Sequence, residues 1–398
     1  MYKKKNNNIN LAIYTNFFLG KQSTFVFREI AFLDQIVNLK VFAQRYSNKY
    51  FSISNIFVFD DHNNLFYRSL EKLVKKIKKK PFFNLSISKQ WSKINFKDYD
   101  LIHIHFGGSA LKLLESVYID KPIVISIHGQ DATKSFGRIE YRKSWLKILN
   151  RIHNKPHKII FPSFFLRDAF VKNIDSKINF NTCVIPYGVD FKEIHSSSKI
   201  RKNNVYTFIQ VSGFQKKKGH IYSIKAFKKL IDSGVDAKLI FVGSGDEEHL
   251  CEKIVRQLDL SNHIDFLGFK KFSEISDLLL RSNAFIHHSI TDDDGDTEGL
   301  PNAIIEALGY GLPVLSSYHS GIPEIVKHGE NGLLAQEKDV HQIFLNMKKI
   351  MSDNKIKPDI NSIKNKYGIK NHCNLILETY NDLLGTGNEY SSNKNLIK

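Results

Sequence analysis

Short apolar runs alternate with amphipathic segments along most of the 398-residue chain. Each run has the length of a β-strand, whereas the segments between them, such as residues 219–231 and 246–258, have the length and periodicity of helices. This alternation is typical of parallel sheets covered by helices on both faces, so we predict an α/β fold. The strand candidates are residues 101–106, 123–127, 159–161, 205–211, 239–242, 264–267, 284–286 and 313–315.

A polar, basic stretch without periodicity interrupts the alternation near residue 200. We therefore predict two doubly wound, Rossmann-like domains that face a cleft. The predicted order is an N-terminal domain over residues 1–195, a linker over 196–204 and a C-terminal domain over 205–370. Residues 371–385 are expected to form a C-terminal helix, for which a return to the N-terminal domain is one option. Residues 386–398 are expected to be disordered.

Composition narrows the class of protein. No apolar stretch is long enough for a transmembrane helix, and three widely spaced cysteines favour neither a disulfide framework nor a zinc cluster, which fits a cytoplasmic protein. The formal net charge of +18 suits nucleic acid, an anionic membrane surface or acidic substrates. The same net charge is expected of any chain that is rich in lysine throughout, so the charge alone does not identify a binding partner.

The most specific segment is residues 298–324. Pro301 suits the first turn of a helix, which places Glu298 in the preceding loop and Glu306 in the second turn. The start of such a helix binds anions, so a pyrophosphate could lie there while the two carboxylates accept hydrogen bonds from sugar or ribose hydroxyls. The backbone N–H groups expected to face this anion belong to Gly299, Leu300 and Asn302.

This segment resembles family 4 of the retaining glycosyltransferases, which have the two-domain GT-B fold. The resemblance rests on two glutamates separated by seven residues, the Gly-Leu-Pro-Val entry at 311–314 and the Gly-Ile-Pro-Glu turn at 321–324. Residues 294–301 resemble the bacterial exopolysaccharide and lipopolysaccharide branch of that family. Similarity runs over about residues 10–385 and is weak in 40–98.

The resemblance implies further donor-binding residues in the C-terminal half. Lys218 matches a lysine that contacts the donor phosphates in the family. The family's arginine position falls on Gly213, so that contact is missing here, and Lys216 or Lys217 is the candidate to replace its charge.

In the N-terminal half, residues 127–131 resemble the family's His-Gly-x-Asp motif after the fifth strand. The resemblance implies that His128 lines the donor sugar near the reaction centre, and we name His128 and Glu298 as the catalytic residues. Gly20 and Lys21 open the segment that resembles the family's first strand–helix turn, and we expect them in an acceptor-side loop.

The implied function is transfer of a sugar from a nucleotide-sugar donor to a glycan or lipid-linked glycan, with retention of anomeric configuration, in bacterial surface-polysaccharide synthesis. No residue is a clear covalent nucleophile, so we expect front-face, donor-assisted transfer. Two alternatives remain: a nucleotide-sugar 2-epimerase of the same fold, and a basic nucleic-acid-binding protein. The sequence carries no zinc knuckle, RNA-recognition motif or helix-turn-helix signature, so nucleic acid is not an expected partner.

No metal or other cofactor is expected. The run Asp292-Asp-Asp-Gly-Asp296 has oxygen ligands suited to Mg²⁺ or Mn²⁺. In the resembled fold, however, a helix dipole and lysines neutralise the leaving diphosphate.

A lysine-rich helix is predicted near residues 70–80. Leu70, Leu73, Val74 and Ile77 follow helical spacing among six lysines. Such a helix can lie on anionic lipid at the inner face of the cytoplasmic membrane, or be a solvated helix packed on its domain.

Overall fold

The computed structural model describes residues 9–18, 24–47, 55–59, 65–174, 180–191 and 205–386. The chain divides into two compact units: unit 1 comprises residues 1–188 and 369–398, and unit 2 comprises residues 189–368. The predicted linker, 196–204, and residues 387–398 of the predicted tail lie outside the described ranges. Within these ranges, no helix combines the length and apolar character needed to span a membrane.

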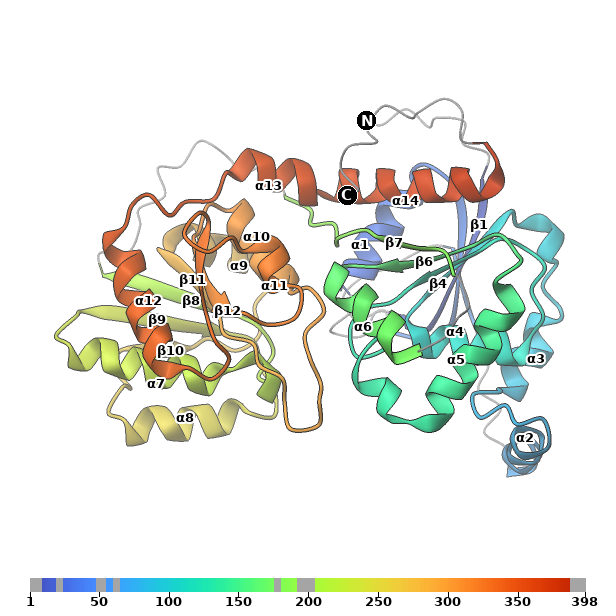
Figure 1. Ribbon diagram of the computed structural model, residues 1–398, viewed down its shortest axis with the longest axis horizontal. Coiled ribbons are helices and arrows are strands. Elements are labelled where there is room, and N and C mark those ends of the chain that lie inside the picture. The colour runs from blue at the N-terminus through green and yellow to red at the C-terminus, as the bar shows by residue number, and fades with distance from the viewer. Residues whose placement is uncertain are drawn as a thin grey trace. The chain divides into compact units, whose positions relative to one another are not determined.

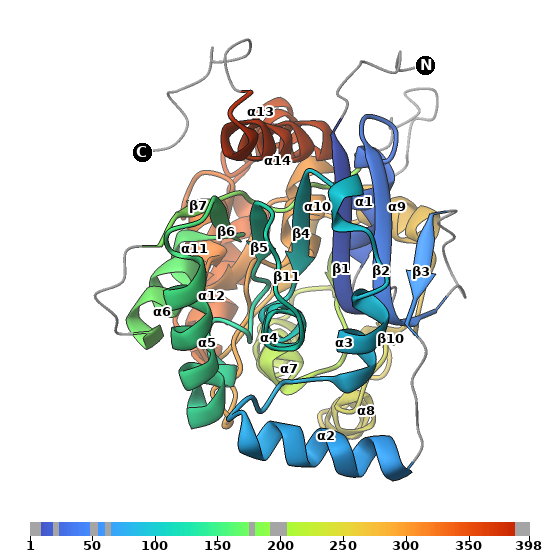
Figure 2. The same ribbon diagram turned by 90° about the vertical axis from the view of Figure 1, so that its right-hand side faces the viewer.

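Unit 1 is built on a seven-stranded parallel sheet in the order β3-β2-β1-β4-β5-β6-β7, which runs from right to left in Figure 2. Its elements are β1 Asn10–Phe18, α1 Thr24–Leu33, β2 Asn38–Tyr46, β3 Ile56–Val58, α2 Leu65–Ile77, α3 Leu85–Trp91, β4 Leu101–His105, α4 Gly107–Ser116, β5 Ile123–Ser126, α5 Ile139–Ile152, β6 His157–Phe161, α6 Phe164–Ile174, β7 Thr182–Val184 and α14 Ile369–Leu384, with 3-10 turns at Phe96–Asp98 and Lys134–Gly137.

Both faces of this sheet are buried, because apolar residues stand on both sides of the central strands and the polar exceptions on β4, His103 and His105, are themselves buried. On β1, Leu11 and Ile13 enter one core cluster, whereas Ala12 and Tyr14 enter the cluster on the opposite face. The first cluster is completed by α1 and α14, which lie side by side although they stand at opposite ends of the sequence (Figure 1). The C-terminal helix is therefore part of the core of unit 1.

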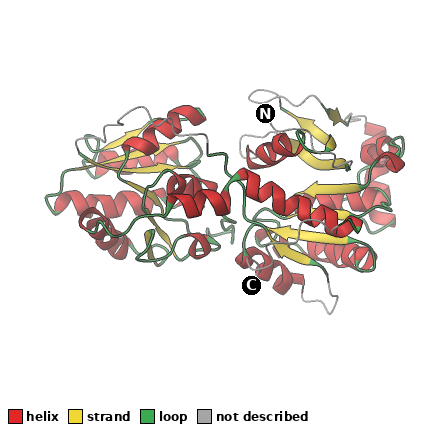
Figure 3. Ribbon diagram, turned by 90° about the horizontal axis from the view of Figure 1, so that it is seen from above, coloured by secondary structure: helices red, strands yellow, loops and turns green. Residues whose placement is uncertain are grey.

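Unit 2 is built on a six-stranded parallel sheet in the order β10-β9-β8-β11-β12-β13, with helices on both faces (Figure 3). Its elements are β8 Tyr206–Val211, α7 His220–Asp232, β9 Ala237–Val242, α8 Glu248–Gln257, β10 Ile264–Phe266, α9 Phe272–Arg281, β11 Ala284–His287, α10 Asn302–Gly309, β12 Val314–Ser317, α11 Ile322–Ile325, β13 Gly332–Ala335, α12 Val340–Ser352 and α13 Ile360–Tyr367, with a 3-10 turn at Lys216–Lys218.

The strand order reverses once in each unit. In unit 2 the chain moves outward from β8 to β9 and β10, then returns to β11 on the other side of β8. In unit 1 the same reversal falls between β1 and β4. Open α/β sheets bind ligands at the carboxyl ends of the two strands that flank such a reversal. The loops after β8 and β11 are therefore expected to form the ligand site of unit 2.

Candidate functional site

The loops that follow β8 and β11 in unit 2 contact each other directly. Gly219 ends the lysine turn with φ +66°, and a Cβ there would lie 1.8 Å from the carbonyl oxygen of His288. The backbone N–H of Ile290 in turn donates to the carbonyl of Lys217. Only glycine allows this approach, which holds the three lysines against the loop after β11.

Each of these lysines is paired with a carboxylate from the acidic segment 292–298. Lys216 pairs with Asp293 near the surface, where both side chains are more than half exposed. Lys217 lies 3.1 Å from Oδ2 of Asp296, and its Nζ is also 3.9 Å from Oε1 of Glu298. A site rich in both charges thus lies at the reversal of the sheet.

The most buried of these ion pairs joins Lys218, predicted to bind the donor, with Glu298, predicted to be catalytic. Nζ of Lys218 lies 2.9 Å from Oε2 of Glu298, and both side chains are largely buried. Burial would raise the pKa of Glu298, but the charges of Lys218 and Lys217 lower it to about 2. Glu298 is therefore a carboxylate at neutral pH, and Oε1 has no hydrogen-bond partner among the described residues.

The backbone of Glu298 is held from both sides by the loop after β12. Its N–H donates to Nε2 of His319 at 3.0 Å, and the hydroxyl of Ser320 donates to its carbonyl. Nδ1 of His319 lies 2.6 Å from Oε1 of Glu337. Burial alone would raise the pKa of Glu337, but hydrogen bonds from His319 and Thr291 lower it below its ordinary value.

These three supporting residues are not predicted from the sequence. His319 and Ser320 lie in the segment 298–324, and their one visible signal was a position just after a strand, where polar side chains reach the ligand edge of the sheet. Glu337 follows β13 and carried no signal, because its partner His319 is reached only through the folded sheet.

The start of α10 has the open geometry expected of an anion site. Pro301 is the N-cap residue and offers no side-chain acceptor. In the described part of the chain, no group accepts a hydrogen bond from the backbone N–H of Gly299, Leu300 or Asn302. The unpaired N–H donors would be satisfied by an anion at the start of the helix. Oδ1 of Asn302 is also buried without a partner among the described residues, but it is an acceptor and suits a hydroxyl of a ligand.

Two other predicted donor residues are placed as follows. Glu306 is half-buried in the second turn of α10, four residues after Asn302 and therefore on the same face of the helix. Gly213 follows β8, and a Cβ there would meet only the carbonyl oxygen of Ser244, at 3.5 Å. A Cβ therefore fits at Gly213, so the backbone there does not require glycine in place of the family's arginine.

In unit 1, His128 follows β5 and is surrounded by rings. It lies beside Phe25 and Phe106, with ring centroids 4.9 and 4.6 Å away. Its Nδ1 lies 3.2 Å from the hydroxyl of Tyr187 and its Nε2 lies 3.2 Å from Nδ1 of His105. Both ring nitrogens therefore have partners. Gly20 and Lys21 lie outside the described residues.

The aspartate of the same motif has a structural role. Asp131 is buried and its Oδ2 accepts the N–H of Gly107 at 2.7 Å, where α4 begins. Burial raises the pKa of Asp131, and hydrogen bonds from backbone groups oppose the rise. The loop that carries His128 is thereby fixed to the first turn of α4.

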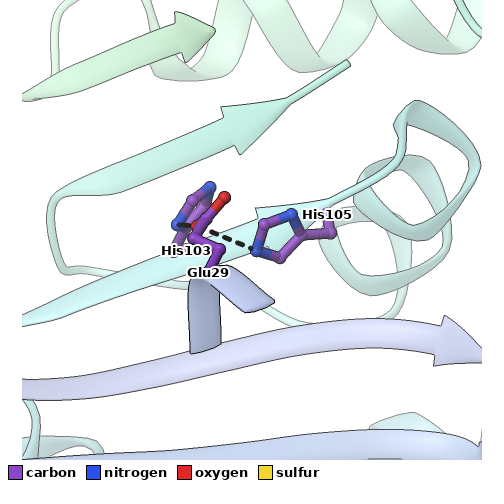
Figure 4. A group of neighbouring side chains, drawn as sticks. All are labelled: Glu29, His103 and His105. Atoms are coloured by element: carbon purple, nitrogen blue, oxygen red, sulfur yellow. Dashed lines mark ion pairs between the residues drawn. The ribbon is translucent and has the colours of Figure 1, made fainter. Parts of the chain in front are cut away.

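Behind His128 lies a group of buried side chains that the sequence did not predict. Glu29 on α1 points between His103 and His105 on β4 (Figure 4). One ligand atom from each of the three lies within 4.8 Å of the other two. Alternation along β4 turns both histidines to the α1 face of the sheet, but nothing local identifies Glu29 as their partner.

Two family models match adjoining parts of the chain. "Glycosyltransferase Family 4" matches residues 37–193, and "Glycosyl transferases group 1" matches residues 190–378. Among curated relatives, the amylovoran biosynthesis glycosyltransferase AmsK of Erwinia amylovora is 28% identical over 250 residues. That match covers 62% of this chain and 59% of AmsK.

Two further relatives extend the comparison. The UDP-Gal:α-D-GlcNAc-diphosphoundecaprenol α-1,3-galactosyltransferase of Escherichia coli is 24% identical over 316 residues, which are 72% of this chain and 76% of that protein. Anabaena HepE, solved with UDP-glucose, superposes with a TM-score of 0.70 over 94% of this chain and 100% of its own, at 17% identity. The predicted α/β architecture is confirmed, and the chain belongs to family 4 of the glycosyltransferases, with the GT-B fold.

Proposed function

We propose that this glycosyltransferase moves a sugar from a nucleotide-sugar donor to a glycan or lipid-linked glycan acceptor during synthesis of a bacterial surface polysaccharide, with retention of anomeric configuration. The observation that carries the proposal is the meeting of Lys217, Lys218 and Glu298 with the open start of α10 at the sheet reversal of unit 2. Lysines and unpaired N–H groups would stabilise the diphosphate as it leaves.

The names of the relatives support the same reading. AmsK is named for amylovoran biosynthesis, and HepE was solved with UDP-glucose. The Escherichia coli relative is named for an acceptor attached to diphosphoundecaprenol. We therefore propose a uridine diphosphate sugar as the first donor to test and a lipid-linked glycan as the acceptor class. None of these three relatives is named as an epimerase, and a 2-epimerase is not favoured.

A thermal-shift screen over sugars of UDP, GDP, ADP and CMP tests donor binding, because a ligand that binds the folded state raises the unfolding temperature. One base should stabilise the protein clearly above the others. Incubation with that donor alone should leave its sugar unchanged, whereas a 2-epimerase would convert it. Salt-dependent gel shifts, with no stabilisation by any nucleotide sugar, would instead favour the nucleic-acid-binding alternative.

We propose that transfer needs no metal or other cofactor. Asp293 and Asp296 of the acidic segment are paired with Lys216 and Lys217. Oδ1 of Asp292 accepts the backbone N–H groups of Asp294 and Asp296, which shapes the loop. Transfer should therefore continue in EDTA, and a loss of activity that Mg²⁺ or Mn²⁺ restores would reassign this segment as a metal site.

We also propose that unit 1 binds anionic membrane lipid through α2. Leu73 and Ile77 on this helix are 53% and 69% exposed, whereas Leu70 and Val74 are partly buried, so part of its apolar side is left uncovered. A groove of about 750 Å³ runs between α2 and α5. Its basic lining consists of Lys72, Lys75, Lys76, Lys79, Lys143 and Lys147. Exposed apolar groups among lysines suit a surface of lipid phosphates.

Vesicles that contain anionic lipid test this attachment. Each lysine near such a surface contributes about 1 kcal/mol, so changing four to glutamine should weaken binding about 100-fold or more. The four are Lys72, Lys75, Lys76 and Lys79. A charge-matched control changes four exposed lysines of unit 2, namely Lys348, Lys349, Lys355 and Lys357. Equal loss in both variants would mean that net charge, and not α2, attracts the membrane.

A further inference from the structure

A line of polar side chains runs through the interior of unit 1, and the proposed transfer uses only one of them, His128. The hydroxyl of Tyr187 lies 3.2 Å from Nδ1 of His128, whose Nε2 lies 3.2 Å from Nδ1 of His105. Nε2 of His105 then lies 3.5 Å from Oε1 of Glu29 (Figure 4). Two elements, β4 and α1, and the loops after β5 and β7 thus contribute to one continuous path.

The far end of this line is anchored on α14. Oε2 of Glu29 lies 3.0 Å from Nε2 of His372, and Nδ1 of His372 lies 2.7 Å from the carbonyl oxygen of Pro186. A carbonyl oxygen only accepts, so Nδ1 of His372 donates. Its Nε2 faces Oε2 of Glu29, and the second carboxylate oxygen, Oε1, lies 3.5 Å from Nε2 of His105 and 3.6 Å from Nδ1 of His103.

The anchored carboxylate sets the direction of every hydrogen bond in the line. Burial would raise the pKa of Glu29, but its hydrogen bond with His372 helps to hold the pKa well below its ordinary value, so Glu29 is ionised and only accepts. Oε1 of Glu29 and Nε2 of His105 face each other at 3.5 Å, and neither has a hydrogen-bond partner among the described residues. A nitrogen lone pair aimed at a buried carboxylate oxygen would be repelled, so this geometry favours a proton on the nitrogen. Nε2 of His105 therefore carries the proton that faces Glu29.

The position of the proton on His105 determines the position of the proton on His128. Burial lowers the pKa of His105, so the ring is neutral and its Nδ1 is an acceptor. His128 must then donate from Nε2, which leaves its Nδ1 as an acceptor 3.2 Å from the Tyr187 hydroxyl, whose proton is also directed at the carbonyl oxygen of His128, 3.3 Å away. Nδ1 of His103 lies 3.6 Å from the same oxygen of Glu29, but it is also 2.7 Å from the hydroxyl of Tyr380, and Nε2 of His103 is 2.7 Å from the hydroxyl of Ser126. Because each hydroxyl can donate or accept, either tautomer of His103 is satisfied without changing the order at His105.

We infer that His105 and Glu29 are positioning residues that fix His128 in the tautomer with its proton on Nε2. His128 thereby presents the Nδ1 lone pair, and a sugar hydroxyl would donate to it in place of Tyr187. This inference rests on the proposed function for the hydroxyl, but the tautomer itself is a property of unit 1 alone. The line fixes the ring before any ligand arrives, so His128 is an acceptor and does not donate a proton to the sugar.

The tautomer is measured by ¹⁵N NMR of the full chain labelled at histidine, with the His128 signal identified by its loss in His128→Gln. His105→Phe removes the acceptor for Nε2 of His128 and should give a mixture of tautomers. The matched control is His105→Asn, whose amide oxygen can still accept near the former Nδ1. We expect the wild-type tautomer to be preserved in that variant.

Glutamate 29 provides a second, independent pair of variants if His105→Phe fails to fold. In Glu29→Gln the amide oxygen can still accept from His105 while its NH₂ donates to His372, so the tautomer of His128 should not change. Glu29→Leu removes the acceptor that faces His105 and should therefore give a mixture of His128 tautomers. Activity follows the same division: kcat should fall tenfold or more in His105→Phe and Glu29→Leu and recover largely in the two conservative variants.

Three results would overturn the inference. One is a proton on Nδ1 of His128 in the wild type, and another is an unchanged tautomer in His105→Phe. The third is one equivalent of bound zinc per chain, lost in the His105 variants, because Glu29 and His105 would then be metal ligands. If His128→Gln is fully active, the proposed catalytic role of His128 fails, while the NMR result still decides whether His105 and Glu29 fix its tautomer.

Discussion

Glu306 is the residue that most directly tests the donor site. It shares a face of α10 with Asn302, beyond the unpaired N–H groups at the start of that helix. If its carboxylate accepts from the ribose diol, Glu306→Gln replaces a charge-assisted bond worth about 1.5–3 kcal/mol with a neutral one. Affinity for the free nucleoside diphosphate should fall roughly tenfold to a hundredfold. Calorimetry with that diphosphate checks this, and unchanged binding would remove Glu306 from the ribose site.

The ion pairs of Glu298 predict that the stability of the fold depends on pH. Against the effect of burial, Lys218 and Lys217 lower the pKa of Glu298 from 4.5 to about 2. A lowered carboxylate pKa contributes stability above the unfolded-state pKa and loses it as the pH falls through the folded-state value. Wild type should therefore exceed Glu298→Gln by up to about 3 kcal/mol near pH 6, and the gap should shrink as the pH falls toward 2. Urea unfolding from pH 3 to pH 6 measures it. A gap that stays constant over this range would contradict the ion pair.

At the scale of elements, the loop between β8 and α7 contains two glycines with opposite tolerances. Gly213 has room for a side chain, whereas a Cβ on Gly219 would collide with the carbonyl of His288. We expect Gly213→Arg to fold and to bind the free diphosphate about tenfold more tightly, through a new charge-assisted hydrogen bond. Gly219→Ala should lose at least about 1 kcal/mol of stability.

Gly213→Ala is the matched control for both changes. It should leave stability and diphosphate affinity close to wild type, because its Cβ makes only an ordinary contact with Ser244. Thermal unfolding and calorimetry on the three variants decide the matter. If Gly213→Arg folds but binds no more tightly than Gly213→Ala, then Lys217 or another group already supplies the missing charge.

Periodicity alone located most of the elements that carry the site. The helices predicted over 219–231 and 246–258 are α7 and α8, shifted by one or two residues, and the strand predicted over 284–286 is β11. Buried parallel strands and amphipathic helices are the patterns that a sequence displays most clearly. Strand β2, Asn38–Tyr46, which lies between β1 and the edge strand β3, was not named, because Asn38, Lys40, Gln44 and Arg45 interrupt its apolar residues.

The contacts within the site were less accessible to sequence reasoning. Lys218 was chosen through the family resemblance and Glu298 through its place before the helix that starts near Pro301. Nothing in the sequence shows that they pair, because 80 positions separate them. The same applies to Glu29, which meets His105 only after α1 packs on β4. Spacing identifies residues on one element, whereas partners on different elements follow from the topology of the sheet.

At the scale of the whole molecule, α14 makes unit 1 discontinuous in sequence. It places Cys373, Ile376 and Tyr380 in the core cluster that also contains β1 and α1. A chain that ends at Gly368 should therefore lose the cooperative unfolding transition of unit 1 and keep that of unit 2. Calorimetry distinguishes the two.

A control changes three exposed positions of α14 to alanine, namely Lys370, Asn374 and Glu378. These side chains face away from the core, so both transitions should remain. Survival of the unit 1 transition in the chain that ends at Gly368 would mean that β1, α1 and the other strands form a sufficient core without this helix.

The discontinuity also sets an order of events on the ribosome. Unit 2 is one unbroken stretch, residues 189–368, and its sheet can close as soon as that stretch has emerged. Unit 1 begins first but lacks α14 until the whole of unit 2 has been translated, a delay on the order of ten seconds or more at typical elongation rates. During that interval the apolar side of α1 lacks its contact with Tyr380, and the carboxylate of Glu29 lacks its partner His372. The nascent N-terminal half is therefore the part of this enzyme that most needs a chaperone.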